Sequence, residues 1–379
     1  MNERVKELDS LRGISIILVI AFHSFGRVDF FIRPGARFFD ILHFIKPLTT
    51  IGWVGVDIFF VLSGFLITSI LLKTKDEKNY FKNFYTRRAL RIFPLYFVFL
   101  VVILLLIPII DPEYGTEIHR TLPILLLYQQ NWLVLFDKIP LTPYLGVTWS
   151  LAIEEQFYLV WPAIVFFTRK ETLIKISVGI IVFSILARIL GILLGSDHEW
   201  MAEFFYYNTF TRFEQLVFGG LLAVAFTFPV WRERLRLMST PIFVIALAGF
   251  IAVCIPAYPK MVPFDPNTPL ILGGETLAAI FSTALIAMLL IYPERSAIRK
   301  LFQSNVLNFW GKYSYSAYLL HMPVILLLFE PLMQTGIKGT KMYVAYIILV
   351  YGLTALGSLL TWNLLEKHML NLKKYFEYQ

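Results

Sequence analysis

The chain has 379 residues, of which 58% are hydrophobic and only 16% charged, and its mean hydropathy is +0.68. A soluble globular protein of this composition would have too few polar side chains to cover its surface, so the composition predicts an integral membrane protein. The net charge of +8 lies in short Lys and Arg clusters between apolar stretches. That placement is typical of membrane topology signals and argues against binding of nucleic acid.

The single cysteine, Cys254, excludes an intrachain disulfide framework and a cysteine-rich metal site. No histidine spacing is typical of metal ligands either, so we expect no metal. The charged first ten residues lead into an apolar stretch without a small-residue cleavage site, which predicts a retained span rather than a signal peptide. Because apolar stretches recur along the whole chain, we expect one membrane domain over residues 1–379.

Eleven apolar stretches are candidate membrane spans. In chain order they cover residues 13–32, 51–72, 92–110, 121–136, 147–168, 174–195, 205–229, 240–257, 270–292, 313–330 and 342–365. The loop 73–91 holds seven basic residues and is therefore predicted to be cytoplasmic, which also places the N-terminus there. The later basic clusters fall on the same side only if one of the eleven stretches is not a span.

Residues 121–136 are the stretch to remove, because it is the shortest and has Gln129, Gln130 and Asn131 at its middle. In hydrocarbon each of these amides would need a partner. The sequence therefore predicts an all-α polytopic membrane protein with about ten transmembrane helices and a re-entrant or interfacial segment near 121–136. Both termini are then cytoplasmic. The loop 26–50 is assigned outside despite four basic residues, either as a surface for an acidic substrate or as a tolerated exception.

Two ionisable residues share one face of the first predicted span. Arg12 and His23 are eleven residues apart, which returns to the same helix face within about 20° and lies roughly 16 Å further along the axis. An ionisable side chain in the middle of a membrane is costly and indicates a function by default. The alternative is a structural histidine that bonds to a carbonyl or hydroxyl group of a neighbouring helix.

Polar residues also stand inside two other predicted spans. The segment WVGVDIFFVLSGFLIT has Ser63 and Gly64 at its middle, where the alternative reading is plain helix packing at the glycine. The segment TWSLAIEEQFYLVWP puts Ser150 and Glu154 on one helix face, with Glu155 beside them. Two carboxylates inside a membrane helix are hard to explain by structure alone, so we expect a function for them.

A third polar segment, GKYSYSAYLLHMPV, places Ser314, Tyr318 and His321 on one face. A lone histidine such as His321 is more often structural than catalytic.

Three arginines lie at the start of the third predicted span, in the segment FYTRRALRIFPLYF. Arg87, Arg88 and Arg91 are spaced so that two guanidinium groups share a face, a geometry that suits bidentate binding of phosphates. An anchor for anionic lipid is the alternative. The nearby Arg12 favours a polyanion site, and hence a phosphorylated donor that enters from the cytoplasm and reacts within the membrane.

These segments resemble the motifs of the acyltransferase 3 family of multispanning membrane acyltransferases. The resemblance rests on LDSLRGISIILVIAFHS, VDIFFVLSGFLI, FYTRRALRIFPLY, WSLAIEEQFYLVWP and, more loosely, YSYSAYLLHMPV, in this order. It covers about residues 5–370 and implies ten spans around an acyl-transfer site. Members move an acyl group, usually acetyl, from cytoplasmic acyl-coenzyme A to hydroxyl groups of extracytoplasmic glycans. Some carry a second, soluble esterase-like domain, which we expect this chain to lack.

The resemblance also implies roles for seven residues. The expected donor-binding residues are Arg12, Arg88, Arg91 and Ser63, and the expected catalytic residues are His23, Glu154 and Glu155. We expect His23 to be the general base that deprotonates a sugar hydroxyl, with Glu154 or Glu155 orienting it or stabilising its imidazolium form. A transient acetyl-His23 is an alternative within the same assignment.

A second class of function fits some of the same features. In a proton-coupled transporter or flippase for an anionic lipid-linked substrate, the buried His and Glu would relay protons. The two halves of the chain show no convincing inverted repeat, which favours the enzyme. The expected partners are acyl-coenzyme A, with acetyl-CoA as the default donor, a glycan or glycolipid acceptor and membrane lipid, and homo-oligomerisation is left open. The expected location is the bacterial inner (plasma) membrane.

Overall fold

The computed structural model describes residues 5–27, 49–110, 112, 121–136, 142–194, 198–255 and 270–377. These residues form helices joined by turns and loops, with no β-strand among them. Nine of the described helices are long and apolar enough to cross a bilayer. The predicted all-α polytopic membrane fold is therefore confirmed.

The long helices are, in chain order, α1 (Lys6–Phe25), α4 (Val54–Lys73), α5 (Tyr80–Ile110), α8 (Trp149–Phe167), α9 (Lys170–Leu194), α12 (Pro229–Cys254), α13 (Glu275–Ile291), α16 (Ser314–Gln334) and α17 (Thr340–Thr361). Single turns precede or follow several of them: η1 (Ile51–Trp53), η2 (Gly146–Thr148), η4 (Leu270–Gly274) and η5 (Trp362–Glu366). The shorter elements are α7 (Gln130–Phe136), α10 (His198–Tyr207), α11 (Thr209–Ala225), α14 (Ala297–Leu301), α15 (Asn305–Lys312), α18 (Lys367–Asn371) and η6 (Leu372–Tyr375). Although α11 has only 17 residues, its length of about 25 Å approaches that of the hydrocarbon layer. With α11 counted as a membrane span, the number of spans is the predicted ten.

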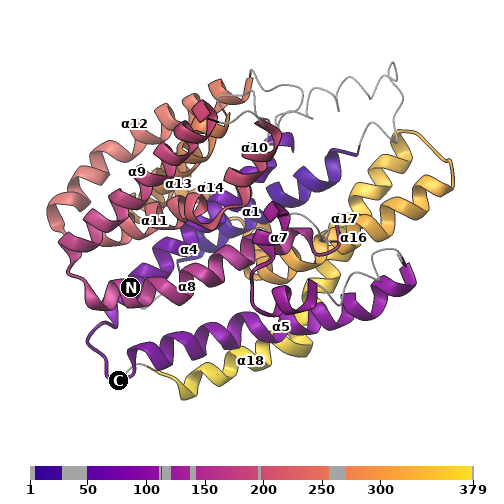
Figure 1. Cartoon of the computed structure of the whole chain (residues 1–379), viewed down its shortest axis with the longest axis horizontal. Coiled ribbons are helices and arrows are strands. Elements are labelled where there is room, and N and C mark those ends of the chain that lie inside the picture. Colours follow the sequence, from indigo (N-terminus) through magenta and orange to yellow (C-terminus); the bar gives the residue numbers. More distant parts are fainter. Residues whose placement is uncertain are drawn as a thin grey trace.

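The long helices surround α4, which is the most enclosed of the nine candidate spans. It contacts α1, α8, α11 and α13, whereas α9, α12 and α17 lie at the outside of the bundle (Figure 1). The outer faces carry large exposed apolar side chains such as Leu105, Ile109, Leu193 and Leu364. Apolar side chains that point outward over several helices fit a hydrocarbon surrounding and not water.

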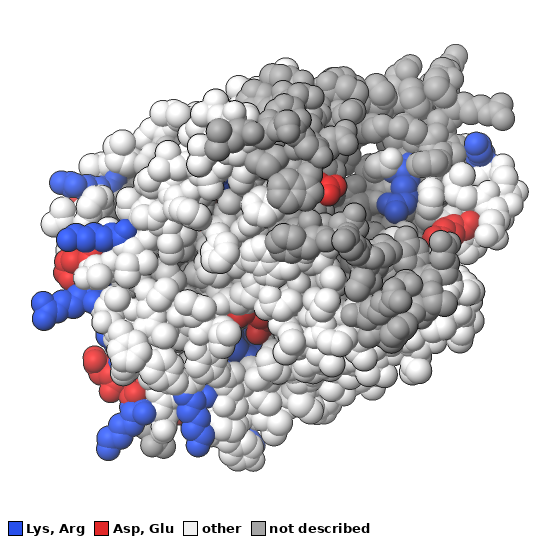
Figure 2. Space-filling view, viewed as in Figure 1, with Lys and Arg blue, Asp and Glu red and all other residues white. Residues whose placement is uncertain are grey.

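The two ends of the chain lie at the same end of the bundle (Figure 1). On the face drawn in Figure 2, many of the Lys and Arg side chains also gather at this end, while most of the remaining surface is uncharged. The helix ends Lys73, Tyr80, Phe167 and Lys170 border two of the basic loops expected there. Charge and topology therefore agree that one end of the molecule is a polar, basic surface.

Several helix boundaries differ from the sequence prediction, and α12, for example, begins at Pro229 instead of residue 240. Helix α1 begins and ends earlier than the predicted 13–32, so His23 lies in its last turn instead of its middle. Helix α5 begins at Tyr80, so the arginines expected at the edge of a loop stand on a helix. The predicted span 205–229 is divided at Asn208, whose side chain caps α11 by accepting from the Phe210 amide at 2.8 Å. Hydropathy marks the apolar part of a helix, whereas hydrogen bonding and caps decide where the helix ends.

As predicted, residues 121–136 do not form a single membrane-spanning helix. A helical stretch over 121–126 ends in a turn at Tyr128, whose φ of 53° is in the left-handed region, and α7 starts at Gln130. Residues 28–48 lie outside the described residues. They include the end of the first predicted span and most of the loop 26–50, so the prediction for these segments is not tested.

Two of the three amides at the centre of this segment, those of Gln130 and Asn131, have partners on other elements. Gln130 donates to the Thr148 carbonyl at 2.8 Å, and Asn131 donates to the Thr209 hydroxyl at 2.9 Å. Asn131 also accepts from the Gln156 amide at 2.9 Å. These bonds supply the partners that the amides need away from water, so the segment packs inside the bundle against α8 and α11.

Close backbone contact between α4 and α11 depends on two glycines. A Cβ atom on Gly64 would lie 1.8 Å from the Leu216 carbonyl oxygen, and one on Gly219 would lie 1.9 Å from the Val61 carbonyl oxygen. Only glycine permits this approach, so the packing role predicted for Gly64 is present. Its neighbour Ser63 points in a different direction, toward the cavity described next.

Candidate active site

A cavity of about 250 Å³ lies between α1, α4, α5, α8 and α16. Five of the seven residues expected at the site line it: Arg12, Ser63, Arg88, Arg91 and Glu154. They come from four helices that are distant in the sequence. Figure 2 shows a hollow between α8 and α5 in which acidic and basic side chains are visible on an otherwise mostly uncharged face.

Three arginines, Arg12, Arg88 and Arg91, form one wall of the cavity and are called here the arginine cluster. Arg12 pairs with Asp9 one turn earlier on α1, at 2.7 Å. Arg88 lies over the rings of Phe84 and Tyr158 at 5.9 and 5.7 Å from their centroids. The aromatic faces help to hold its guanidinium group in place at the cavity.

The chain's own C-terminal segment packs beside this cluster. Arg87, which shares the basic motif, donates to the carbonyls of Lys373 and Phe376 at 3.1 and 3.0 Å, so its role is to hold that segment. Burial and the positive charges of Arg91 and Arg88 lower the pKa of the Lys373 amine to about 7. Three guanidinium groups from α1 and α5 thus meet beside an amine of η6 that gains its proton readily next to an anion, an arrangement suited to a polyanion.

The two glutamates of α8 face different surroundings. Glu154 lines the cavity with Ser63 and Tyr158 as side-chain hydrogen-bond partners, and these two hydroxyl groups also bond to each other. Glu155 is not among the lining residues, and one of its carboxylate oxygens is buried without a hydrogen-bond partner in the described part of the chain. The geometry therefore associates Glu154, and not Glu155, with the cavity.

His23 lies outside the cavity lining, in contact with a second histidine. Its Nδ1 is 2.9 Å from the Val19 carbonyl and 3.3 Å from Nε2 of His321 on α16. The two ring centroids are 5.1 Å apart. Arg27 donates to the backbone carbonyl of His23. Within the described residues, neither glutamate is among these partners, so the group that contacts His23 is His321.

Tyr318 connects His23 and His321, called here the histidine pair, to the cavity. Its ring lines the cavity and lies 5.6 Å from the His321 ring, centroid to centroid. Its hydroxyl donates to the Val147 carbonyl at 2.8 Å and hydrogen-bonds to Ser150, which also lines the cavity. Tyr318 and Ser150 therefore lie between the arginine cluster and the histidine pair, and contacts between neighbouring side chains lead from one to the other.

A family model described as an acyltransferase domain matches residues 5–363. The chain belongs to this acyltransferase family. The resemblance inferred from the five sequence motifs is thereby confirmed, and the cavity is the place where all five of those motifs meet.

Relatives of this acyltransferase domain are found in bacteria. The peptidoglycan O-acetyltransferase OatA of Listeria monocytogenes is 32% identical over 339 residues, which are 85% of this chain and 50% of that protein. The "Putative peptidoglycan O-acetyltransferase YrhL" of Bacillus subtilis strain 168 is 30% identical over 339 residues, or 84% of this chain and 48% of that protein. The chain spans about half the length of the curated relatives it matches. No solved structure matches it.

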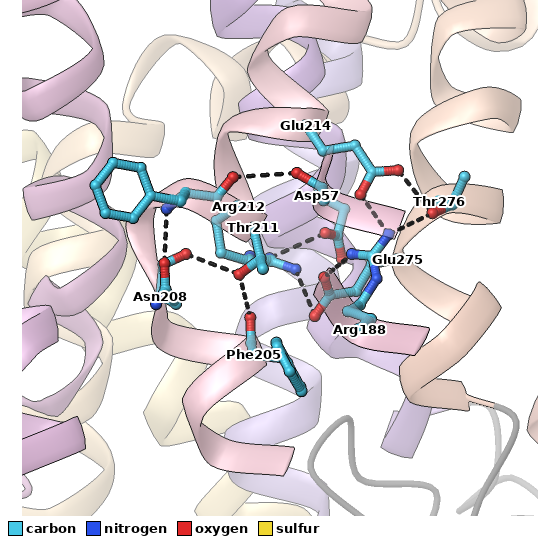
Figure 3. Close-up of polar contacts among 11 residues, drawn as sticks. Asp57, Arg188, Phe205, Asn208, Thr211, Arg212, Glu214, Glu275 and Thr276 are labelled. Carbon is cyan, nitrogen blue, oxygen red and sulfur yellow. Dashed lines mark hydrogen bonds and ion pairs between the residues drawn. The ribbon is translucent and has the colours of Figure 1, made fainter. Parts of the chain in front are cut away.

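The acyltransferase domain also contains a buried ion network that sequence reasoning largely missed (Figure 3). Arg212 pairs with Asp57 at 2.9 Å and with Glu275 at 3.0 Å, and Arg188 pairs with Glu275 at 2.9 Å and with Glu214. These side chains are at most 5% exposed and come from α4, α9, α11 and α13. Two guanidinium groups and three carboxylates thus tie four helices together.

The network reaches the cavity through aromatic rings. The Arg212 guanidinium lies 5.3 Å from the ring centroid of Phe60, which lines the cavity, and 5.5 Å from that of Trp149. None of the five residues was assigned a role from the sequence. A usable signal was present, because Arg188 and Glu275 are single charges inside apolar stretches and such charges need partners.

Proposed function

We propose that this protein is a membrane O-acetyltransferase that moves an acetyl group from acetyl-coenzyme A to a hydroxyl group of a cell-surface glycan. The family match and the relatives named as peptidoglycan O-acetyltransferases support the reaction class, and they make peptidoglycan the first acceptor to test. The protein would lie in the bacterial plasma membrane with the basic end, and so both termini, in the cytoplasm.

The observation that carries the proposal is a cavity lined both by the arginine cluster and by Tyr318, whose ring lies against His321 of the histidine pair. The cluster and Lys373 would bind the phosphates of coenzyme A, because guanidinium groups make bidentate, charge-assisted hydrogen bonds to phosphate oxygens. A cavity of about 250 Å³ is small beside the roughly 300–1,000 Å³ of typical ligand pockets. It suits the narrow acyl-pantetheine arm, with the nucleotide remaining at the arginines.

The chemistry would take place at the histidine end. As the acceptor oxygen attacks the thioester carbonyl carbon, His23 takes the hydroxyl proton, and the C–O bond forms. The C–S bond then breaks, and the imidazolium of His23 returns the proton to the leaving thiolate, which departs as the thiol of coenzyme A. An acetyl-His23 intermediate is the alternative path through the same residue.

Glu154 would act on the donor side of this arrangement. It lines the cavity beside Ser63 and Tyr158, and it interacts electrostatically with Arg88 and Arg91. We therefore assign Glu154 to orienting those guanidinium groups and the donor arm, in place of a direct contact with His23. Glu155 is the weaker candidate, because it does not line the cavity.

The test uses purified protein in detergent with isotopically labelled acetyl-coenzyme A and a soluble glycan fragment. Release of coenzyme A and acetylation of the glycan are both measured, the latter by mass spectrometry. His23→Ala should lower turnover by about a hundredfold or more while donor binding is kept. Arg88→Ala and Arg91→Ala should weaken donor binding, whereas the matched substitution of the exposed Arg236 should leave it unchanged.

The outcomes separate the proposal from its alternative. Glycan acetylation by the His23→Ala protein at the parent rate would contradict the catalytic assignment. Uptake of a lipid-linked substrate into vesicles by the parent protein, without any release of coenzyme A, would favour the flippase.

A further inference from the structure

The hydrogen-bonding partners of His23 specify where its ring carries a hydrogen. The Val19 carbonyl oxygen, 2.9 Å from Nδ1, can only accept, so Nδ1 must be the protonated nitrogen that donates to it. His23 in this tautomer has its free lone pair on Nε2. That nitrogen is then the basic atom of the ring.

The partners of His321 specify its tautomer in the same way. Its Nδ1 is 2.7 Å from the carbonyl oxygen of Tyr318, which again can only accept, so the hydrogen of the neutral ring is on Nδ1. The lone pair of His321 is consequently on Nε2, which lies 3.3 Å from the protonated Nδ1 of His23. The two rings are thus arranged with His23 as the donor and His321 as the acceptor.

We propose that His321 is a positioning residue that, together with the Val19 carbonyl, holds His23 in the tautomer with a basic Nε2 and accepts a hydrogen bond from its Nδ1–H in the imidazolium form. This rests on the proposed function, in which His23 is the general base. It assigns to a neutral histidine the part that a carboxylate plays in a Ser-His-Asp triad. His321 does not touch the substrate, because Tyr318 stands between it and the cavity.

The surroundings of the pair support a neutral acceptor of this kind. His321 is fully buried, and the ring of His23 packs edge-on against Phe22. The charged group beside the pair in the described residues is Arg27, which donates to the His23 carbonyl and opposes a second positive charge. An imidazolium formed on His23 during turnover therefore depends on the Nε2 lone pair of His321 for stabilisation.

Two substitutions of His321 separate positioning from packing. In His321→Gln the amide oxygen can still accept from Nδ1 of His23, whereas His321→Leu fills a similar volume without an acceptor. We expect His321→Leu to lower kcat by about a hundredfold or more, with the KM for the donor unchanged, and His321→Gln to restore kcat to within about tenfold of the parent. His368→Leu, at an exposed histidine of α18, is the control and should change neither constant.

A spectroscopic measurement gives a second result that a packing role would not produce. Nitrogen-15 NMR of histidine-labelled protein, with His23 identified by its loss in His23→Ala, should show Nδ1 protonated in the parent and in His321→Gln. In His321→Leu the His23 signals should shift toward a mixture of tautomers. The pH at which kcat falls should also move in His321→Leu and stay close to the parent value in His321→Gln.

Two results would overturn the inference. One is a His321→Leu protein that turns over at the parent rate while His23→Ala is inactive, which would leave the proposed function intact. The other is a folded, donor-binding His321→Gln protein that is as inactive as His23→Ala, and this decides the matter even if His321→Leu does not fold. Activity in His23→Ala itself would instead remove the proposed function.

Discussion

The same substitution, glycine to alanine, should have opposite effects at two helical positions of this protein. At Gly64 a new Cβ would lie 1.8 Å from the Leu216 carbonyl oxygen, about 1.6 Å short of ordinary van der Waals contact. The obstacle is backbone, so α4 and α11 must move apart. At Gly179, an exposed residue of α9, a Cβ meets nothing within 4 Å.

The sizes of the two effects follow from this geometry. Overpacking against an unyielding neighbour costs about 1–3 kcal/mol, and Gly64→Ala should lie at or above the upper end because the shift also strains the Arg212–Asp57 pair between the same helices. Gly179→Ala should gain about 0.5–1 kcal/mol from the lost conformational freedom of the unfolded glycine. The two proteins should therefore differ by at least about 3.5 kcal/mol in stability.

The assay is unfolding of both variants and the parent in the same detergent, followed by tryptophan fluorescence. Gly64→Ala should unfold at a lower temperature than the parent and Gly179→Ala at a slightly higher one. A Gly64→Ala midpoint at or above that of the parent would refute the close approach of α4 and α11 at Gly64. Because Ser63 lines the cavity next to this contact, Gly64→Ala should also lose acetyl transfer before it loses its fold.

Two further substitutions test the buried polar groups, each against an exposed control. Arg212→Ala leaves Asp57 and Glu275 without their shared cation and should destabilise by about 3–5 kcal/mol, whereas Arg236→Ala, at a residue 66% exposed, should change stability by less than about 0.5 kcal/mol. Asn131→Leu removes one hydrogen-bond partner of Thr209 and one of Gln156 and should cost about 1–3 kcal/mol, while Asn363→Ala on an exposed surface should cost almost nothing. The same unfolding assay measures both pairs, and equal shifts within a pair would contradict the burial.

Much of the fold could be predicted because membrane spans are encoded locally. Each span has to bury its backbone within hydrocarbon, so its apolar length appears directly in the sequence. The polar middle of residues 121–136 was equally readable, since three amides in lipid had to have partners. The helix ends were less readable. The break at Asn208 is a cap, and apolar residues continue on both sides of it.

The site could be predicted less completely because its contacts are between distant residues. Periodicity places Arg12 and His23 on one face of α1, but it does not show that Glu154 meets Ser63 or that His321 meets His23. The last contact joins residues 298 positions apart. The motif around His321 was visible in the sequence, but nothing in a single sequence indicates which buried histidine has a second histidine as its neighbour.

The spacing along α1 restricts the kind of donor that this arrangement can use. His23 is eleven residues after Arg12, so its Cα lies roughly 16 Å further along the helix than that of Arg12, whose guanidinium would hold a phosphate. A donor bound at the arginine cluster can react at His23 only if its acyl carbonyl is a comparable distance from its phosphates. Acetyl phosphate, in which the two groups share one oxygen, cannot occupy both places. An acyl thioester on a long flexible arm can, and the narrow cavity between Arg88 and Tyr318 provides a path for that arm.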